Sequence, residues 1–90
     1  MYQLTTTKQF EKDYKLCKKR GLNADLINTV FELLGSTGSL PAKYKTHKLS
    51  GNYAGFLECH IQGDWLLVWA INEDIKEITL TRTGTHSDLF

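Results

Sequence analysis

The chain has 90 residues, of which 41% are hydrophobic and 23% are charged, and its formal net charge is +1. This length predicts one domain, residues 1–90, with a single modest core. No apolar run reaches the roughly 18–20 residues of a membrane span, and the N-terminus has no basic-then-apolar signal pattern. We therefore expect a soluble, cytoplasmic protein without a membrane partner. Cys17 and Cys59 fit no metal-ligand spacing and are interpreted as buried thiols.

The small net charge hides an asymmetry between the two halves of the chain. Residues 1–52 contain nine Lys and Arg against four Asp and Glu, whereas residues 53–90 contain two against six. A basic N-terminal half can steer an anionic partner such as RNA, and it can equally dock on an acidic protein. An ordinary solvated helix face explains the same charges, so charge alone leaves all three interpretations open.

The first predicted elements are a short edge strand at residues 2–5 and a helix over Thr7–Arg20. Thr6 and Gln9 have the spacing of a capping box at the start of this helix. Gly21 supplies a left-handed stop, and the cations just before it favour the helix dipole. The apolar stripe of the helix consists of Phe10, Tyr14 and Cys17.

A second helix is predicted to follow, capped by Asn23 and ended by Gly35. Only a few residues join the two helices, so we expect them to pack antiparallel as a hairpin. The broad apolar face of the second helix is interpreted as core and consists of Leu26, Ile27, Val30, Phe31 and Leu34.

Residues 35–52 are predicted to form a loop, and a loop of this length in a small domain is usually functional or disordered. Three strands then follow at Tyr53–His60, Trp65–Ile71 and Ile75–Arg82, with short turns at Ile61–Asp64 and Asn72–Asp74 between them. Short turns predict an antiparallel meander, and the tail, residues 83–90, is expected to make one helical turn against the sheet. The fold class is therefore α+β, with an N-terminal helix hairpin packed on a mainly antiparallel, roughly four-stranded sheet.

Polar residues are expected to converge at one rim of this sheet. His60 and Asp64 flank the first turn of the meander, and the antiparallel third strand returns Arg82 to the same rim. His86 in the tail can reach the same place. A slip in strand register would weaken this inference. The position of His47, in the basic loop before the first strand, does not follow from hairpin geometry.

Imidazoles, a carboxylate and a guanidinium in one concavity suit phosphodiester chemistry. One histidine can take the proton of a ribose 2′-OH while another protonates the departing 5′-oxygen. Arg82 matches the geometry of a phosphate and its phosphorane. Trp65 and Phe90 can stack on unpaired bases.

Each of these residues also has an ordinary structural interpretation. His60 can satisfy a carbonyl at a strand end, and Asp64 can be a turn residue. Arg82 can pair with Glu58 or Glu77. The indole of Trp65 can be core. A metal site built from His47, His60, Asp64 and His86 has no tight ligand pair to support it, and we expect no metal and no cofactor.

Three motifs together resemble the YafQ-like toxins, a branch of the RelE/ParE superfamily of bacterial type II toxin–antitoxin systems. They are Tyr44-Lys45-x-His47-x-Leu49-x-Gly51, Glu58-x-His60-x3-Asp64-Trp65-x-Leu67, and Arg82-Thr83-Gly84-Thr85-His86-Ser87-x-Leu89-Phe90. The resemblance covers essentially the whole chain and implies a RelE-like fold.

The resemblance implies a ribosome-dependent, metal-independent mRNA interferase that cuts the codon in the ribosomal A site. Its partners would be the ribosome with mRNA and rRNA, a cognate antitoxin, and operator DNA only through the antitoxin complex. The functional positions that match the family are His47, His60, Asp64, Arg82 and His86, with Trp65 and Phe90 as the aromatic groups. We add Lys43, Lys45 and Lys48 of the basic loop as RNA-binding residues.

The residues suggest roles within this hypothesis. His86 is assigned as the proton donor to the leaving oxygen or as a general acid/base, with His60 and Asp64 as the base or its orienting pair. Arg82 would stabilise the phosphorane, and His47 would be an auxiliary proton or phosphate contact. Which histidine is the acid and which is the base stays open at this point.

Two departures from the family pattern bear on activity. Leu57 stands where an arginine is frequent, and Gly63 stands where a proline is common. An inactive RNA-binding member is therefore one alternative. A ParE-like toxin that acts by binding DNA gyrase is the other, although five candidate catalytic residues would be surplus in a protein that only binds.

Overall fold

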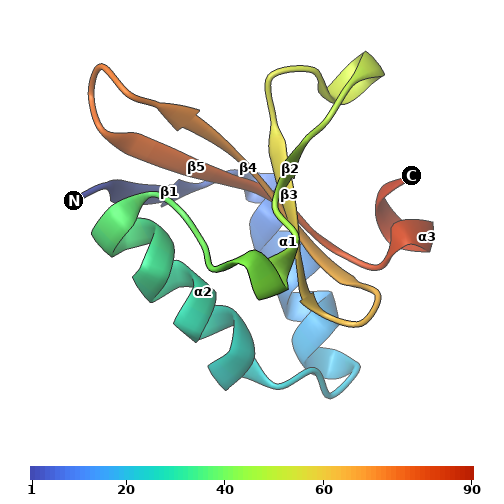
Figure 1. The fold of residues 1–90 in the computed structure, drawn as a ribbon. Coiled ribbons are helices and arrows are strands. Elements are labelled where there is room, and N and C mark those ends of the chain that lie inside the picture. Colours follow the sequence, from blue (N-terminus) through green and yellow to red (C-terminus); the bar gives the residue numbers. More distant parts are fainter.

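The computed structural model describes residues 1–90 as two helices packed on one face of a five-stranded sheet (Figure 1). The strands are β1 (Gln3–Thr6), β2 (His47–Lys48), β3 (Leu57–Gln62), β4 (Trp65–Asn72) and β5 (Glu77–Gly84). The helices are α1 (Lys8–Lys19), α2 (Ala24–Thr37) and α3 (His86–Leu89), with single 3-10 turns η1 (Ala42–Tyr44) and η2 (Gly51–Tyr53). None of the helices has the length and apolar character of a membrane span.

The sheet has the order β1-β5-β4-β3-β2, and its centre is the predicted meander β3-β4-β5. Two features differ from the prediction. The N-terminal strand β1 pairs in parallel with β5, so the sheet is mixed. The loop before the meander contributes a fifth strand, β2, in which His47 pairs with Glu58 of β3. A strand of two residues is too short to show the alternation of apolar and polar residues that predicts a strand. Strand β2 forms because the edge of β3 provides hydrogen-bonding partners.

The N-cap of helix α1 lies one residue later than Thr6, the position that the capping-box spacing predicted. Thr7, rather than Thr6, is the N-cap, and its hydroxyl oxygen accepts from Phe10 N at 2.9 Å. Gln9 does not close a capping box, because its amide donates to Asp13 at 3.0 Å. The Thr7 hydroxyl also donates to Thr81 O of β5 at 2.9 Å, so a tertiary contact selects the cap.

Helix α2 starts as predicted but runs past its predicted end. Asn23 caps it by accepting from Asp25 N at 2.9 Å. The helix continues through Gly35 to Gly38, whose φ of 75° provides the left-handed stop. Gly35 is tolerated inside the helix because β1 passes close by, with Tyr2 N donating to Gly35 O at 2.7 Å. The two helices meet through the ring of Phe31, whose centroid lies 6.2 Å from that of Phe10.

The strand bounds differ from the predictions at two turns. Strand β3 starts at Leu57 instead of Tyr53, because residues 51–53 form the turn η2. Strand β5 starts at Glu77 instead of Ile75, because the Asn72 side chain accepts from Asp74 N at 3.0 Å and extends the turn. The tail forms one helical turn, α3, as predicted.

Apolar side chains of β4 pack on both faces of the sheet, as its continuous hydrophobic run predicts. On the helix side, Leu67 and Trp69 join the main core with residues of α1 and α2. On the opposite side, Leu66 and Val68 pack against Leu89 of α3, with Tyr53 and Phe56 at the edge of this small cluster. The second face is therefore only partly covered, and the candidate site lies on it.

Candidate active site

Three histidines form a row on the sheet face opposite to α1 and α2. The ring centroids of His47 in β2 and His60 in β3 are 6.4 Å apart, and those of His60 and His86 in α3 are 6.1 Å apart. The ring of Phe90 follows at 6.3 Å from His86. We call these three histidines the histidine row. The fold thus brings together residues that are separated by up to half of the chain.

His86 in the tail helix α3 is paired with Asp64 in the turn between β3 and β4. The His86 ring donates from Nδ1 to Asp64 Oδ1 at 2.5 Å, and the His86 backbone N–H donates to the same oxygen at 3.3 Å. The ring hydrogen bond, followed by the backbone one, lowers the pKa of Asp64. Because Nδ1 is bound to this carboxylate, Nε2 is the ring nitrogen of His86 that is left to meet a substrate.

The hypothesis that Asp64 orients His60 is wrong in this geometry. The nearest polar partner of the His60 ring is the carbonyl of Gly63, 3.3 Å from Nδ1. Gly63 has a φ of 54°, a left-handed conformation that carries the Asp64 carboxylate toward the tail. Because a carbonyl oxygen only accepts, Nδ1 of His60 holds the proton and Nε2 holds a free lone pair in the neutral ring.

His47 reaches the histidine row through the short strand β2. Its Nδ1 lies 3.1 Å from Lys45 O, and its Nε2 lies 3.2 Å from Glu58 Oε1. Each ring nitrogen of His47 therefore faces an acceptor oxygen. Glu58 is 3% exposed, and its second oxygen has no hydrogen-bond partner. Its contact with His47 was not predicted, although the spacing of two from His60 places the side chains of Glu58 and His60 on one face.

Arg82 does not join Asp64 at the rim, in contrast to the prediction. Its Nε donates to Asp13 Oδ2 at 2.7 Å and its Nη2 donates to Asp13 Oδ1 at 3.3 Å. These bonds raise the pKa of Arg82, with a smaller effect of the same sign from Tyr53. The backbone places Arg82 opposite Val68, two residues beyond the last β5 residue that pairs with β1, and there α1 lies within reach of a long side chain. The Arg82 side chain remains 23% exposed, and its Nη1 takes no part in the contact with Asp13.

Asp13 is an organising residue that the sequence analysis missed. It also accepts from Thr83 N at 3.2 Å and from Gln9 Nε2 at 3.0 Å, so it binds donors from two elements. The signal was present in the sequence. Asp13 lies between Phe10 and Cys17 on the buried stripe of α1, where a carboxylate needs a buried partner.

Trp65 is core, and its assignment as an RNA-stacking residue is wrong. The side chain is 3% exposed and packs on the helix side of the sheet. Its indole N–H donates to Thr83 Oγ1 at 2.9 Å, and Thr83 in turn donates to Leu66 O at 2.7 Å. Phe90, by contrast, is 60% exposed and rests edge-on against Tyr53, so its face is available to a base.

Replacing Trp65 with phenylalanine is expected to lower the free energy of unfolding by about 1 kcal/mol more than the same change at Trp69. Both indoles are buried, but Trp69 Nε1 has no hydrogen-bond partner, so Trp69→Phe loses volume without losing a bond. Urea denaturation of the two variants measures the difference. Equal losses would show that the Trp65–Thr83 bond adds nothing to stability.

The three lysines of the basic loop lie close to His47. Lys43 lies over the ring of Tyr44 at 5.2 Å, Lys45 has a left-handed φ of 53°, and Lys48 neighbours His47 in β2. All three are exposed and have no acidic partner. Lys48 pairs with Leu57, so its side chain lies on the sheet face opposite to that of His47, where it lines a pocket with Leu57 and Ile71.

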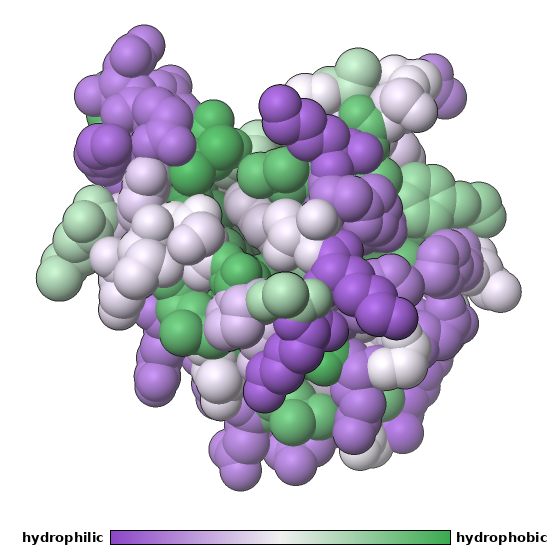
Figure 2. All heavy atoms as spheres, viewed as in Figure 1, coloured by the Kyte–Doolittle hydropathy of each residue, from purple (hydrophilic) through white to green (hydrophobic).

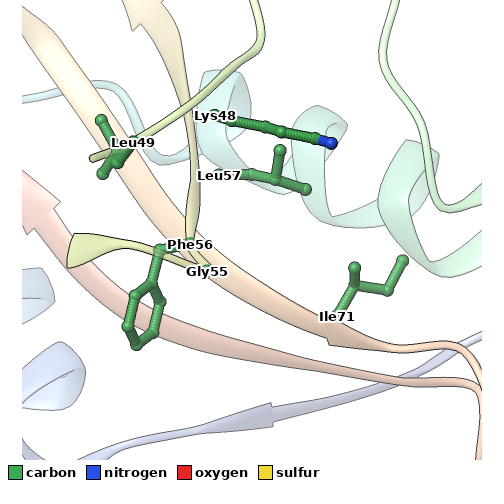
Figure 3. Close-up of a pocket in the computed structure, with 6 residues that line it drawn as sticks. All are labelled: Lys48, Leu49, Gly55, Phe56, Leu57 and Ile71. Carbon is green, nitrogen blue, oxygen red and sulfur yellow. The ribbon is translucent and has the colours of Figure 1, made fainter. Parts of the chain in front are cut away.

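An apolar pocket of about 290 Å³ lies at the other end of β3 from the β3–β4 turn (Figure 3). Its lining is Lys48, Leu49, Gly55, Phe56, Leu57 and Ile71. Figure 2 shows apolar atoms in the hollow between the β4–β5 turn and the segment that carries η2. No histidine or carboxylate lines this pocket, so it is separate from the histidine row.

The two departures from the resemblance have different structural consequences. Leu57 packs against the helix-side core, on the face opposite to Glu58 and His60, so a leucine there removes no cation from the histidine row. Gly63 occupies a positive φ that proline cannot adopt, so it changes the geometry of the turn. The structure contains no group of three or more His, Cys, Asp or Glu side chains spaced to hold a metal ion.

Comparison with known proteins identifies the family. The sequence pattern described as "Bacterial toxin of type II toxin-antitoxin system, YafQ" matches residues 2–90. The chain belongs to the YafQ family. It is 37% identical over 83 residues to the mRNA interferase toxin YafQ of Escherichia coli strain K12, which covers 91% of this chain and 88% of that protein.

Solved YafQ structures share the fold over the whole chain. A His-to-Gln mutant of E. coli YafQ superposes with a TM-score of 0.91 at 32% identity, covering 100% of this chain and 99% of that one. YafQ in the E. coli DinJ–YafQ toxin–antitoxin complex gives a TM-score of 0.89 at 33% identity, covering 99% and 97%. The mixed sheet and the short tail helix described above are therefore those of a YafQ-family toxin.

Proposed function

We propose that this chain, as one domain of residues 1–90, is the toxin of a type II toxin–antitoxin system and cleaves mRNA in the ribosomal A site. The observation that carries the proposal is the histidine row with Asp64 on its third member. The separation of 6.1 Å between the rings of His60 and His86 puts both within reach of one phosphodiester. The E. coli relative is named an mRNA interferase toxin, which supports the same reaction.

The hydrogen bonds favour one division of labour between two histidines. His60 faces no carboxylate, and the free lone pair on its Nε2 makes it the base that takes the ribose 2′-OH proton. The hydrogen bond to Asp64 fixes the orientation of the His86 ring, and the carboxylate can stabilise the charge of an imidazolium, so we assign His86 as the acid that protonates the departing 5′-oxygen. The 2′-oxygen then bonds to phosphorus as the bond to the 5′-oxygen breaks, which leaves a 2′,3′-cyclic phosphate. No metal or cofactor takes part.

Arg82 and His47 would supply positive charge to the transition state. Asp13 binds Nε and Nη2 of Arg82, which fixes the guanidinium, and Nη1 lies outside this contact and would meet a phosphate oxygen. His47 has acceptors on both ring nitrogens, so it suits an electrostatic phosphate contact better than proton transfer. Phe90 would stack on a base, and Lys43, Lys45 and Lys48 would bind the RNA backbone.

The proposed partners follow from this reaction. The ribosome with its mRNA and rRNA is the site of cleavage. A cognate antitoxin would neutralise the toxin, as the DinJ–YafQ complex of E. coli illustrates for a relative. Operator DNA would be bound only through the toxin–antitoxin complex. We propose that the protein acts in the cytoplasm, where all of these partners are found.

Purified protein incubated with programmed ribosomes tests the proposal, with the 3′ ends of the mRNA mapped after the reaction. Cleavage at the A-site codon only in the presence of ribosomes supports it. Poisoning of DNA gyrase with intact mRNA would replace it with a ParE-like activity. Ribosome binding without cleavage would make the chain an inactive RNA-binding member of the family.

Replacing Asp64 with asparagine is expected to slow cleavage at every pH above about 5. The hydrogen bonds from His86 lower the pKa of Asp64 below that of an ordinary aspartate. The ion pair is therefore complete above the ordinary pKa and is lost only when the pH falls through the lowered pKa. Asp64 stays ionised at every pH above about 5, and asparagine removes its charge over this whole range. Single-turnover rates between about pH 5 and 8 measure the effect. A wild-type rate for Asp64→Asn at neutral pH would contradict the assigned pair.

Reversing charge on the exposed face of α1 is expected to weaken ribosome binding and flatten its salt dependence. The triple variant Lys15→Glu, Lys18→Glu and Lys19→Glu removes three exposed cations that can each neutralise a phosphate. Each lost phosphate contact reduces the slope of log affinity against log salt by about 0.7 to 0.9. Filter binding at several salt concentrations gives that slope. An unchanged slope would show that this face is merely solvated.

A further inference from the structure

A two-bond ion pair joins the end of α1 to the tail helix. Arg20 Nη1 donates to Asp88 Oδ2 at 2.6 Å, and Arg20 Nη2 donates to Asp88 Oδ1 at 3.2 Å. Arg20 is the C-cap residue of α1, and Asp88 is the third residue of α3. The side chains are 43% and 24% exposed, so the pair is at the surface. Arg20 thus has a specific partner from the other end of the chain, besides the helix dipole.

Asp88 is the residue that holds α3 together at its N-terminus. Its Oδ2 accepts from Thr85 N at 2.9 Å, and its own N–H donates to Thr85 Oγ1 at 3.3 Å, which completes a capping box. The same oxygen, Oδ2, accepts from Arg20. Arg20 and the Thr85 N–H together hold the pKa of Asp88 well below its usual range, with Arg20 the larger cause. The capping carboxylate is therefore fixed from outside α3 by a residue of α1.

Gly84 shows that the position of Asp88 is closely defined. Its φ is 153°, and a Cβ on Gly84 would lie 2.9 Å from Asp88 Oδ2 and 3.0 Å from Asp88 Cβ. No side chain fits between the two residues. The Asp88 side chain consequently packs directly on the backbone that leads from β5 into α3.

Helix α3 needs such anchors because it is a single turn. An isolated turn of helix is unstable in water, since one hydrogen bond does not offset the entropy of fixing its residues. Three anchors are present: Leu89 packed on Leu66 and Val68, His86 on Asp64, and Asp88 on Arg20. The Arg20 anchor comes from the end of α1, the helix whose Asp13 also binds Arg82.

We propose that Arg20 is a positioning residue for the cleavage reaction: it holds Asp88, and through the capping box it sets the orientation of His86 and Phe90 at the end of the histidine row. The inference rests on the proposed function. Exposed ion pairs add little to global stability. Loss of Arg20 should therefore loosen the tail without unfolding the chain.

The first test compares two variants that each remove one positive charge from α1 or its cap. Arg20→Gln is expected to slow single-turnover cleavage at saturating programmed ribosomes by about 10- to 100-fold, because a small misplacement of His86 is costly. Lys12→Gln removes the same charge from an exposed side chain of α1 that has no hydrogen bond or ion pair to the tail, so it should leave the saturated rate unchanged. Arg20→Lys keeps one of the two bonds and should give an intermediate rate. Equal saturated rates for Arg20→Gln and Lys12→Gln would overturn the inference.

The second test is a double-mutant cycle with Asp88→Ala. If Arg20 acts only through Asp88, the double variant cleaves as slowly as Asp88→Ala alone, because the contact is already lost. If Arg20 acts by touching RNA, the two losses multiply in the double variant, and the inference is wrong.

Hydrogen exchange separates a failure of this inference from a failure of the proposed function. The amides of Leu89 and Phe90 donate to Thr85 O at 3.1 Å and His86 O at 2.8 Å, so their protection reports whether α3 is formed. Arg20→Gln should speed their exchange, and Lys12→Gln should not. If the wild-type protein cuts no mRNA, the proposed function fails while this comparison still tests the anchor. Slower cleavage with unchanged exchange would assign Arg20 to an RNA contact instead.

Discussion

Replacing His86 with alanine is expected to slow mRNA cleavage on programmed ribosomes by about 10²- to 10⁴-fold, the usual contribution of a general acid. His86 is the histidine of the row that is paired with a carboxylate, and its ring is exposed at the end of the site. Alanine removes the proton donor for the 5′-oxygen and leaves Asp64 without its ring partner. The loss should be in the rate at saturating ribosomes, since the lysines of the basic loop remain.

Ser87→Ala is the matched control for His86→Ala. Ser87 is the next residue of the same short helix and is exposed, so its removal should leave the cleavage rate within about twofold of wild type. Both variants should keep the wild-type melting temperature and bind an antitoxin, because neither residue is part of the core. Near-normal cleavage by His86→Ala would remove His86 from the mechanism and shift the acid role to another member of the histidine row.

Replacing Asp13 with alanine is expected to lower the free energy of unfolding by about 3–5 kcal/mol, the usual result of removing one partner of a buried ion pair. Asp13 accepts from the Arg82 side chain and from Thr83 N, and its loss leaves Thr83 N–H and part of a guanidinium without acceptors at the edge of β5. For a domain of about 90 residues this is a large share of a total near 5–10 kcal/mol. Urea denaturation measures the change.

The comparison residue for Asp13 lies two positions earlier on the same helix. Glu11 is exposed in the first turn of α1, so Glu11→Ala should cost less than about 1 kcal/mol through the helix dipole. Asp13→Asn keeps one acceptor and should fall between the two alanine variants. If Asp13→Ala lowers the free energy of unfolding no more than Glu11→Ala does, Arg82 and Thr83 find other partners. The contact between Arg82 and α1 would then not stabilise the fold.

Local patterns predicted most of the fold because the forces behind them act over a few residues. The stripe of α1, the Asn23 cap of α2 and the short turns of the meander each depend on neighbours in sequence. The predictions were wrong where contacts with a distant segment of the chain determine the local structure. Gly35 did not end α2 because β1 packs on it, and β2 was hidden because it forms only against β3.

Hairpin geometry predicted from the sequence that His60 and Asp64 share one rim of the sheet, and that His86 in the tail can reach this rim. The side-chain pairs could not be predicted in this way, since each residue at the rim has several possible partners within reach. Only the tertiary structure placed Asp64 on His86 instead of His60, Arg82 on Asp13 instead of Asp64, and the Trp65 indole in the core. In each case the choice depends on side-chain direction and on a donor or acceptor from another element, and neither is encoded in sequence spacing.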